Sequence, residues 1–470
     1  MAYKPLLALS TALLGLVVFR LTLLDSYLAW GSDMGSYLLT RNWVVGQDQG
    51  GTIVGHFRPP LYGILLLPFT TIWGDLMGSK VLAVLLSVLP GWAMFYFARR
   101  YVRPWIASVA GLALVLIPQN AWTTALNQIT HPAIALTIWA FAELIRIQRK
   151  EIALWRLLPP TFLLVGMNQT SSGILAIVCI IFLLCYREWR MVKAIGAAFG
   201  ASLFWFPFYI PAIPGYSGLY VSSFMVAALP EFSSRLHLLL LAPFASLFPR
   251  QMYPWWIIAL VLTIGAQFVV AEAALNSVLW RMTRYIPIFT ILAGAIGADK
   301  VFSLFKYIAI KRATFALALP LVIFANVYWL GEFHRQAQHY QFVKADSLQA
   351  IAWMDTNTPQ NAYVLAHPEA LAIFIGGMTQ RPWAGTSGRG TALKVYAPMG
   401  NALITAMGWH GVEPSPIPLV DSGIDFIVVD HSSWQGLNDG GAGWRNLDVH
   451  PWFHKQAQFG TVDIYKVGYH

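Results

Sequence analysis

One aspartate early in the chain has the sequence surroundings of a carboxylate that acts at a membrane surface. It lies in Ser32-Asp33-Met34-Gly35-Ser36-Tyr37, which leads into an amphipathic stretch reaching about residue 45. A carboxylate held there can take a proton from an attacking group, which is general-base catalysis. The same position also suits the N-terminal cap of an interfacial helix. Residue chemistry alone leaves both interpretations of Asp33 open.

A second segment offers a cation for binding phosphate. Gly55-His56-Phe57-Arg58 precedes the pair Pro59-Pro60, which fixes the backbone ahead of the next apolar stretch. The guanidinium of Arg58 can grip a phosphate through two parallel hydrogen bonds. The alternative is an interfacial anchor whose charge reaches the headgroups. His56 is either a supporting group or a solvated loop histidine.

A third segment places another arginine at the start of an apolar run. Arg284-Tyr285 comes two residues before Pro287, and the run continues to about residue 299. A cation at the outer end of a span departs from the usual distribution of positive charge, so Arg284 is a second candidate for binding phosphate. A snorkelling anchor is again the alternative. The sequence has no CxxC spacing, and its one HxxxH spacing, at His450 and His454 in the tail, is interpreted as a pair of solvated surface histidines. We therefore expect no metal and no cofactor.

Composition decides what kind of protein must position these residues. The chain has 470 residues, of which 57% are hydrophobic and 11% charged, and its mean hydropathy is +0.57. Soluble domains carry about 25% charged residues. The sequence therefore predicts a multi-pass α-helical membrane protein. In that context we attribute the net charge of +10 (31 − 21) to membrane topology and expect no nucleic-acid partner.

Apolar runs and cationic clusters together predict the topology. We expect about eleven transmembrane helices, beginning with an uncleaved span that ends near Leu24. Interfacial helices follow in a first outer loop at about 25–75. Arginine and lysine clusters fall in alternate loops, which predicts a cytoplasmic N-terminus in the inner (cytoplasmic) membrane.

The tail differs from the rest of the chain. A short helix is expected over 345–353, buried strands over 362–366 and 425–430, and an edge strand over 461–466. The sequence thus predicts a transmembrane domain at 1–335 and a small extracytoplasmic α/β domain at 339–470.

Taken in order, these segments resemble the GT-C superfamily of membrane glycosyltransferases, in the branch of bacterial aminoarabinose transferases and protein O-mannosyltransferases. Members carry an acidic motif, typically Asp-Glu, early in the first outer loop, followed by a helix with a tyrosine. Asp33 and Tyr37 match this pattern, with Met34 in place of the second acid. Because that acid is missing, metal-dependent or two-carboxylate variants of the chemistry are disfavoured.

The later segments extend the resemblance. Members carry a basic residue before Pro-Pro-Leu, matched by Arg58, and an Arg-Tyr pair ahead of a proline, matched by Arg284 and Tyr285. Phe57 stands where some members have glutamate. The tail phrases beginning at Trp353 and Ile424 resemble the small outer domain of many members.

The resemblance implies a transferase that moves a hexosyl or pentosyl group from a polyprenyl-phosphate donor to an acceptor outside the cytoplasmic membrane. Asp33 would be the base, and Arg58 and Arg284 would bind the donor phosphate. Tyr37, His56 and Tyr285 would support them. A single base and no second nucleophile favour direct displacement with inversion at the sugar. The acceptor, whether a glycan, a lipid or a protein, is not specified, and membrane lipids surround the enzyme.

Two other functions remain open. A lipid-linked oligosaccharide transferase or polymerase would use the same acid–base chemistry with a larger donor, but the first outer loop lacks the Asp-x-Asp of metal-dependent members. A transporter or flippase would place ionisable residues at mid-membrane and often show repeated halves. Arg20 is the main charge within a predicted span, near its outer end, and no internal repeat is visible.

Overall fold

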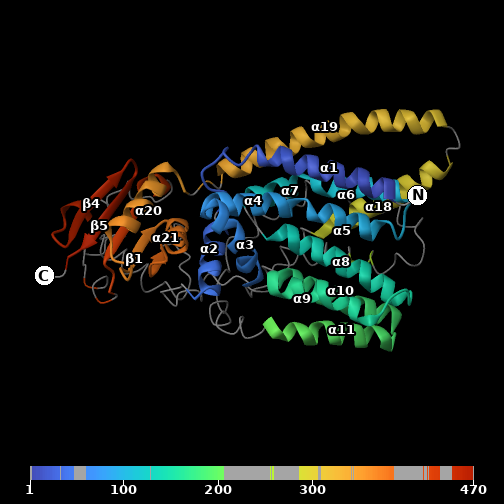
Figure 1. Ribbon diagram of the computed structural model, residues 1–470, viewed down its shortest axis with the longest axis horizontal. Helices are drawn as coiled ribbons and strands as arrows, with labels where there is room; N and C mark the ends of the chain where they lie inside the picture. Colours follow the sequence, from blue (N-terminus) through green and yellow to red (C-terminus); the bar gives the residue numbers. More distant parts are fainter. Residues whose placement is uncertain are drawn as a thin grey trace. The chain divides into compact units, whose positions relative to one another are not determined.

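In a computed structural model, most of the chain forms helices, and a small sheet lies in the tail (Figure 1). The structure describes residues 3–31, 33–46, 60–126, 129–205, 285–304, 308–339, 343–385, 423–434 and 447–468, with 255, 257, 258, 341, 417 and 421. Two compact units divide these residues. The helical unit holds those before 25, from 80 to 205 and from 255 to 338. The mixed unit holds those from 25 to 79 and beyond 338.

The helical unit contains apolar helices that pack side by side. Its helices are α1 (Tyr3–Leu21), most of α4 (Asp75–Ser87), α5 (Leu89–Ala98), α6 (Pro104–Leu116), α7 (Pro118–Ala125), α8 (Thr130–Gln148), α9 (Leu158–Met167), α10 (Gln169–Tyr186), α11 (Trp189–Ser202), α18 (Ile286–Leu304) and α19 (Ile308–His339). Helix α5 packs between α6 and α8, and α9 packs against α8, α10 and α11.

Small residues allow the closest of these approaches. A Cβ on Gly111 of α6 would lie 2.5 Å from the main-chain oxygen of Gly91 in α5. Small residues at such crossings let helix backbones meet, as in other membrane bundles.

Few of the described helices are both long enough and apolar enough to cross a bilayer alone. Tyr3–Leu21 and the continuous pair Asp75–Ala98 have the necessary length and hydropathy, and a third candidate arises if the bent pair Pro104–Leu116 and Pro118–Ala125 counts as one span. Shorter apolar helices, including α3 (Pro60–Trp73), fall below that length. The predicted total of about eleven spans extends over residues outside the described ranges, and it remains a proposal.

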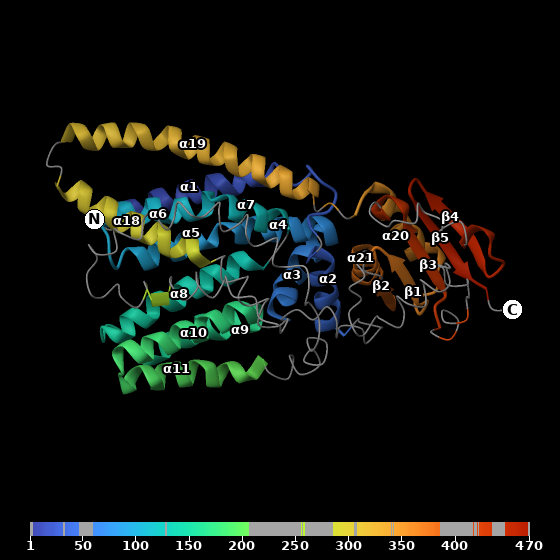
Figure 2. The same ribbon diagram turned by 180° about the vertical axis from the view of Figure 1, so that it is seen from behind.

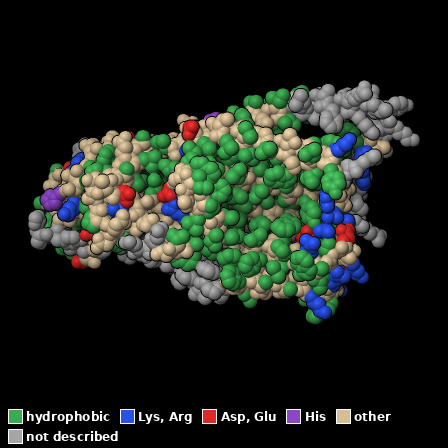
Figure 3. All heavy atoms as spheres, viewed as in Figure 1, with side chains coloured by type: hydrophobic (Ala, Val, Ile, Leu, Met, Phe, Trp, Pro, Cys, Tyr) green, Lys and Arg blue, Asp and Glu red, His purple; other side chains and the backbone are tan. Residues whose placement is uncertain are grey.

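Two of the cationic clusters predicted in alternate loops lie together at one end of the helical unit. Figure 3 shows lysine and arginine side chains gathered there, beside a largely apolar surface. Arg100 pairs with Glu151 of the next such loop, and Arg103 pairs with Asp299. Trp155, close to Glu151 in the chain, and Trp189, the first residue of α11, are 58% and 68% exposed. Basic and tryptophan side chains together are typical of a membrane–water interface.

The mixed unit contains a five-stranded sheet with the order β2-β1-β3-β5-β4 (Figure 2). The strands are β1 (Val364–His367), β2 (Trp383–Gly385), β3 (Phe426–Asp430), β4 (Phe453–Phe459) and β5 (Val462–Val467). β1 runs parallel to β2 and β3, whereas β5 is antiparallel to β3 and β4. Helices α20 (Ala345–Asn357) and α21 (Glu369–Thr379) pack against each other and against the sheet.

One tail prediction needs correction. The segment 461–466 was expected to form an edge strand, but β5 lies inside the sheet between β3 and β4. β4 pairs with its outer edge, and every residue of β5 except Lys466 is buried. β4 itself is rich in exposed polar residues, including His454 and Lys455, as befits a strand at an edge.

Candidate active site

Asp33 begins helix α2 (Asp33–Val44), so its carboxylate lies in the first turn. The unpaired N–H groups at a helix N-terminus favour a negative charge there. Asp33 is half-buried, whereas the residues that follow it as far as Asn42 are buried. Asp33 therefore lies at the start of a helix, one of the two interpretations open from the sequence. Its catalytic role remains a proposal.

Two buried tyrosines lie beside Asp33. Tyr37 is one turn further along α2, and Tyr62 comes from α3. Their ring centroids are 4.4 Å apart with an interplanar angle of 53°. Burial raises the pKa of Tyr62 well above its ordinary value, and the neighbouring Tyr37 and Asp33 add to that effect. Tyr62 is therefore a neutral phenol, and it lies within electrostatic reach of the Asp33 carboxylate.

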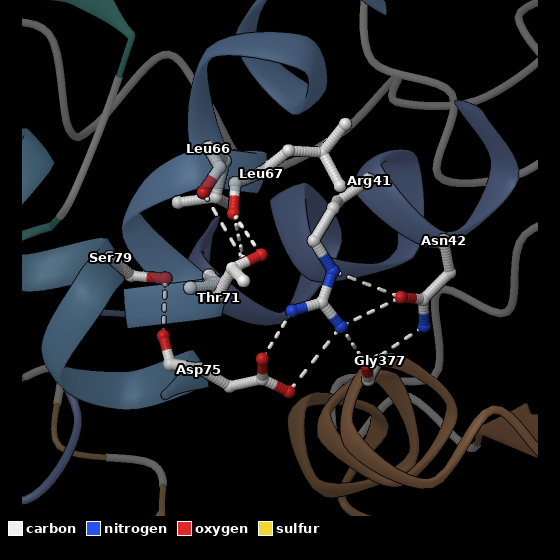
Figure 4. Close-up of polar contacts among 9 residues, drawn as sticks. Arg41, Asn42, Leu66, Leu67, Thr71, Asp75, Ser79 and Gly377 are labelled. Atoms are coloured by element: carbon white, nitrogen blue, oxygen red, sulfur yellow. Dashed lines mark hydrogen bonds and ion pairs between the residues drawn. The ribbon is translucent and has the colours of Figure 1, made fainter. Parts of the chain in front are cut away.

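The other end of α2 carries a polar cluster (Figure 4). Arg41 forms an ion pair with Asp75, the first residue of α4. Its Nε and Nη2 donate to Oδ1 of Asn42 at 3.0 and 2.7 Å. The Nδ2 of Asn42 donates to the main-chain oxygen of Gly377 in α21 at 2.9 Å. The cluster thus joins the first outer loop to the tail.

Tyr285 lies in the helical unit, directly before α18. It is buried, and its hydroxyl donates a hydrogen bond to Oγ of Ser171 in α10. Arg58, Arg284 and His56 lie outside the described residues, so their predicted roles stay predictions. The structure thus brings Asp33 and Tyr37 together and adds Tyr62 beside them, whereas the Arg41–Asp75 pair lies at the other end of α2.

Arg20 is a buried cation of the helical unit. Its side chain donates to Oγ of Ser87 at 2.6 Å and to the main-chain oxygen of Val115 at 2.9 Å. Its guanidinium lies 4.0 Å from the ring centroid of Trp329. Among the described residues, no carboxylate lies within ion-pair distance of it. Arg20 therefore links α1, α4, α6 and α19 within the bundle.

Within the described residues, no group of three or more histidine, cysteine, aspartate or glutamate side chains is placed to hold an ion. Met34, the residue directly after Asp33, is fully buried. Asp33 is thus followed by an apolar side chain packed into the unit.

Sequence reasoning missed Tyr62 and the Arg41–Asp75 pair. Arg41 lies within the amphipathic stretch that reaches about residue 45, and Asp75 lies at the end of the predicted first outer loop. These two residues are 34 positions apart, and no regular spacing relates them. The one local signal in the sequence was the tyrosine directly after Pro-Pro-Leu. This residue, Tyr62, lies on the side of α3 that faces α2.

Comparisons with known proteins place this geometry in a known fold. No family model matches the sequence, and no curated protein matches it. ArnT from Cupriavidus metallidurans in the apo state has a similar structure, with a TM-score of 0.65 and 14% identity over 100% of both chains. ArnT bound to undecaprenyl phosphate gives a TM-score of 0.61 and 13% identity, over 98% of this chain and 99% of that chain.

A second enzyme shows the same architecture over part of its length. The oligosaccharyltransferase of Archaeoglobus fulgidus, tethered to an acceptor peptide, gives a TM-score of 0.51 and 12% identity, over 89% of this chain and 69% of that chain. From end to end, this chain therefore has the fold of ArnT, and it shares that fold with part of the oligosaccharyltransferase.

Proposed function

We propose that the chain is an integral-membrane glycosyltransferase that moves a sugar from a polyprenyl-phosphate donor to an acceptor on the extracytoplasmic side. The observation that carries the proposal is the match to ArnT over the whole of both chains. One of those ArnT structures holds undecaprenyl phosphate. Asp33, at the start of α2 and beside two buried tyrosines, supplies a carboxylate suited to the acid–base step.

In this mechanism Asp33 takes the proton from the acceptor hydroxyl or amine as that group attacks the anomeric carbon. The bond from the sugar to the phosphate breaks, and the leaving polyprenyl phosphate gains negative charge. Arg58 and Arg284 stabilise that charge, because fixed cations in a low-dielectric site favour a developing anion. Tyr37, His56 and Tyr285 have supporting roles. A single base and direct displacement give inversion at the sugar. The sequence indicates no metal dependence.

The proposed topology has about eleven spans, interfacial helices in the first outer loop, a transmembrane domain at 1–335 and an extracytoplasmic domain at 339–470. The arginine-rich end of the helical unit, with its exposed tryptophans, would then face the cytoplasm of the inner membrane. The N-terminus lies on that side, and the tail lies outside.

The experiment is a transfer assay with short-chain polyprenyl-phosphate sugars, using the full chain purified with its lipids. We expect Asp33→Asn to lower kcat by at least about a hundredfold, the scale of a lost general base. Asp25→Asn is the matched control, because Asp25 is an exposed carboxylate close to Asp33 in the chain. Near-normal turnover of Asp33→Asn would reduce Asp33 to a helix-capping residue.

The phosphate-binding residues are tested separately. Arg58→Ala and Arg284→Ala should each raise the donor KM by about tenfold or more, as expected for losing a charged hydrogen bond. Unchanged KM and kcat in both variants would leave these arginines as anchors. A product with retained anomeric configuration would exclude direct displacement.

The same preparation distinguishes the proposed transferase from two alternative functions. A lipid-linked oligosaccharide transferase or polymerase would prefer donors with longer glycans, and the similarity to the oligosaccharyltransferase favours including such donors. A transporter or flippase would move solute or lipid across proteoliposomes without releasing polyprenyl phosphate. The contacts that hold Arg20 inside the bundle give that charge a structural role, so it does not argue for transport.

A further inference from the structure

The helix that carries Asp33 is packed directly onto the tail. Gly35 and Leu38 lie on one face of α2 at helical spacing, and both meet α21. A Cβ on Gly35 would come within 2.9 Å of Cγ2 of Ile373, and a Cβ on Gly377 would come within 2.9 Å of Cβ of Leu38. Asn42, one further turn along that face, donates to Gly377. The whole length of α2 is therefore seated against α21.

The opposite side of α2 is equally close to α3. A Cβ on Gly63 would lie 3.0 Å from the main-chain nitrogen of Arg41 and 3.1 Å from the main-chain oxygen of Thr40. Tyr37 and Tyr62 pack together one turn nearer to Asp33. Helix α2 is thus held between α3 and α21, so a shift of either helix would move Asp33.

Arg41 lies where these elements meet. Its guanidinium pairs with Asp75 at the first turn of α4, and its Nη2 also lies 3.4 Å from the main-chain oxygen of Gly377. That oxygen belongs to the last turn of α21, where carbonyl groups lack partners within the helix and carry partial negative charge. One buried cation therefore serves a carboxylate and a helix C-terminus at once.

We infer that Arg41 is a positioning residue, which fixes the helix bearing Asp33 by tying it to Asp75 and to the C-terminal end of α21. This inference rests on the proposed function. Arg41 lies two turns beyond Asp33, about 12 Å along the helix axis, so it does not touch the reacting groups. The tail domain would then hold the catalytic carboxylate in place, in addition to any contact with an acceptor.

The chemistry of arginine is essential to this arrangement. Its planar fork reaches Asp75, Asn42 and Gly377 at the same time, whereas a lysine ammonium is a single compact charge. Arg41→Lys should keep the attraction to Asp75 and lose the contacts with the other two partners. Arg41→Met removes the charge at similar length.

The experiment uses the full chain in lipid and combines two measurements. Hydrogen exchange is followed separately in peptides covering α2 and α20. The kcat and donor KM are measured with the polyprenyl-phosphate sugar that the wild-type protein uses. The variants are Arg41→Met, Arg41→Lys, Asp75→Asn and the double variant of Arg41→Met with Asp75→Asn.

We expect Arg41→Met to speed exchange in α2 by about tenfold or more while leaving α20 unchanged, because a local opening becomes easier. It should lower kcat by about ten- to a hundredfold, the scale of a misplaced catalytic group, with donor KM within about twofold. Arg41→Lys should fall between wild type and Arg41→Met. The double variant should lose less than the product of the two single losses, because the residues act as a pair.

Two controls separate positioning from general damage. Arg335 is an exposed arginine with a carboxylate partner in α19, so Arg335→Met should change neither measurement. Arg381 is a buried arginine that binds Asp355 and main-chain oxygens of the tail without reaching α2. If Arg381→Met lowers kcat as far as Arg41→Met while α2 exchange stays normal, loosening of the tail explains the loss and the inference fails.

The remaining outcomes are also decisive. Unchanged α2 exchange in Arg41→Met would overturn the inference, whatever the rate of transfer. If the wild-type protein transfers no sugar from any donor, the proposed function fails, but faster α2 exchange would still establish that Arg41 holds this helix. Faster α2 exchange with an unchanged kcat would show that Arg41 stabilises α2 without positioning Asp33.

Discussion

The side chain of Asn42 donates a 2.9 Å hydrogen bond to the main-chain oxygen of Gly377, a residue 335 positions further along the chain. Asn42 belongs to the first outer loop, and Gly377 lies in the last turn of α21 in the tail. The bond satisfies a carbonyl that the helix itself leaves without a partner. Residues distant in sequence therefore build the support for Asp33 jointly.

A first prediction concerns the close approach of α2 and α21. Gly35→Ala adds a Cβ that would lie 2.9 Å from Cγ2 of Ile373 and 3.2 Å from the main-chain nitrogen of Phe374. Since the backbone atom cannot rotate away, we expect α2 to be displaced at a cost of about 1–3 kcal/mol, the usual range for overpacking. Hydrogen exchange in α2 and α21 should become faster.

The matched control for Gly35→Ala is Gly294→Ala. A Cβ on Gly294, also in a helix, would meet no atom within 4 Å. Alanine favours helix over glycine by about 1 kcal/mol, so this control should be neutral or stabilising. Equal exchange rates in α2 for the two variants would mean that α2 and α21 tolerate the extra methyl group.

A second prediction concerns the phenol beside Asp33. Tyr62→Phe keeps the ring that packs on Tyr37 at 4.4 Å and removes the hydroxyl group. The hydroxyl dipole lies within electrostatic reach of the Asp33 carboxylate. We therefore expect kcat to fall by about tenfold, which is less than the loss of about a hundredfold or more when a direct oxyanion-hole donor is removed. The rate of transfer should be measured across a range of pH.

The pH profile distinguishes an electrostatic effect from a packing effect. If Tyr62 tunes Asp33, the acidic limb of the profile should move in Tyr62→Phe, whereas a packing change would lower the rate equally at every pH. Tyr328→Phe is the control, because Tyr328 is an exposed tyrosine of α19. A wild-type profile in Tyr62→Phe would show that its hydroxyl does not influence the base.

Local sequence signals predicted much of the tail. The helix expected over 345–353 is α20 (Ala345–Asn357), which continues four residues beyond the expected end. The strands expected over 362–366 and 425–430 are β1 and β3. They were predictable because continuous apolar runs are typical of strands buried on both faces. Helix α21 was not anticipated, since its Gly376-Gly377 pair reads as a breaker. Those glycines instead make room for Trp383 and Leu38.

The candidate site was predictable only where its signal is local. Asp33 and Tyr37 share one helix turn, so their proximity follows from their spacing. Tyr62 reaches Tyr37, and Asp75 reaches Arg41, through tertiary packing that no regular spacing in the sequence indicates. The cationic loops were predicted for a different reason, from the usual distribution of positive charge in membrane proteins, and the Arg100–Glu151 pair shows two of them in contact.

A third prediction concerns the stability of the sheet in acid. Burial, together with the nearby His431, lowers the pKa of His367 to about 3 from its ordinary 6.5. The unfolded chain therefore binds a proton at this residue at a higher pH than the folded chain does. Stability from the neutral His367 is complete above about pH 6.5, and it declines by up to about 1.4 kcal/mol per pH unit as the pH falls towards 3.

This prediction is checked by following hydrogen exchange in β1 of the full chain between pH 7 and pH 4, after correction for the intrinsic pH dependence of exchange. His367→Gln removes the titrating group and should flatten the dependence, although it is expected to lower stability at neutral pH. His454→Gln alters an exposed histidine of β4 and should leave the wild-type slope intact. A slope that survives in His367→Gln would assign the acid sensitivity to other groups.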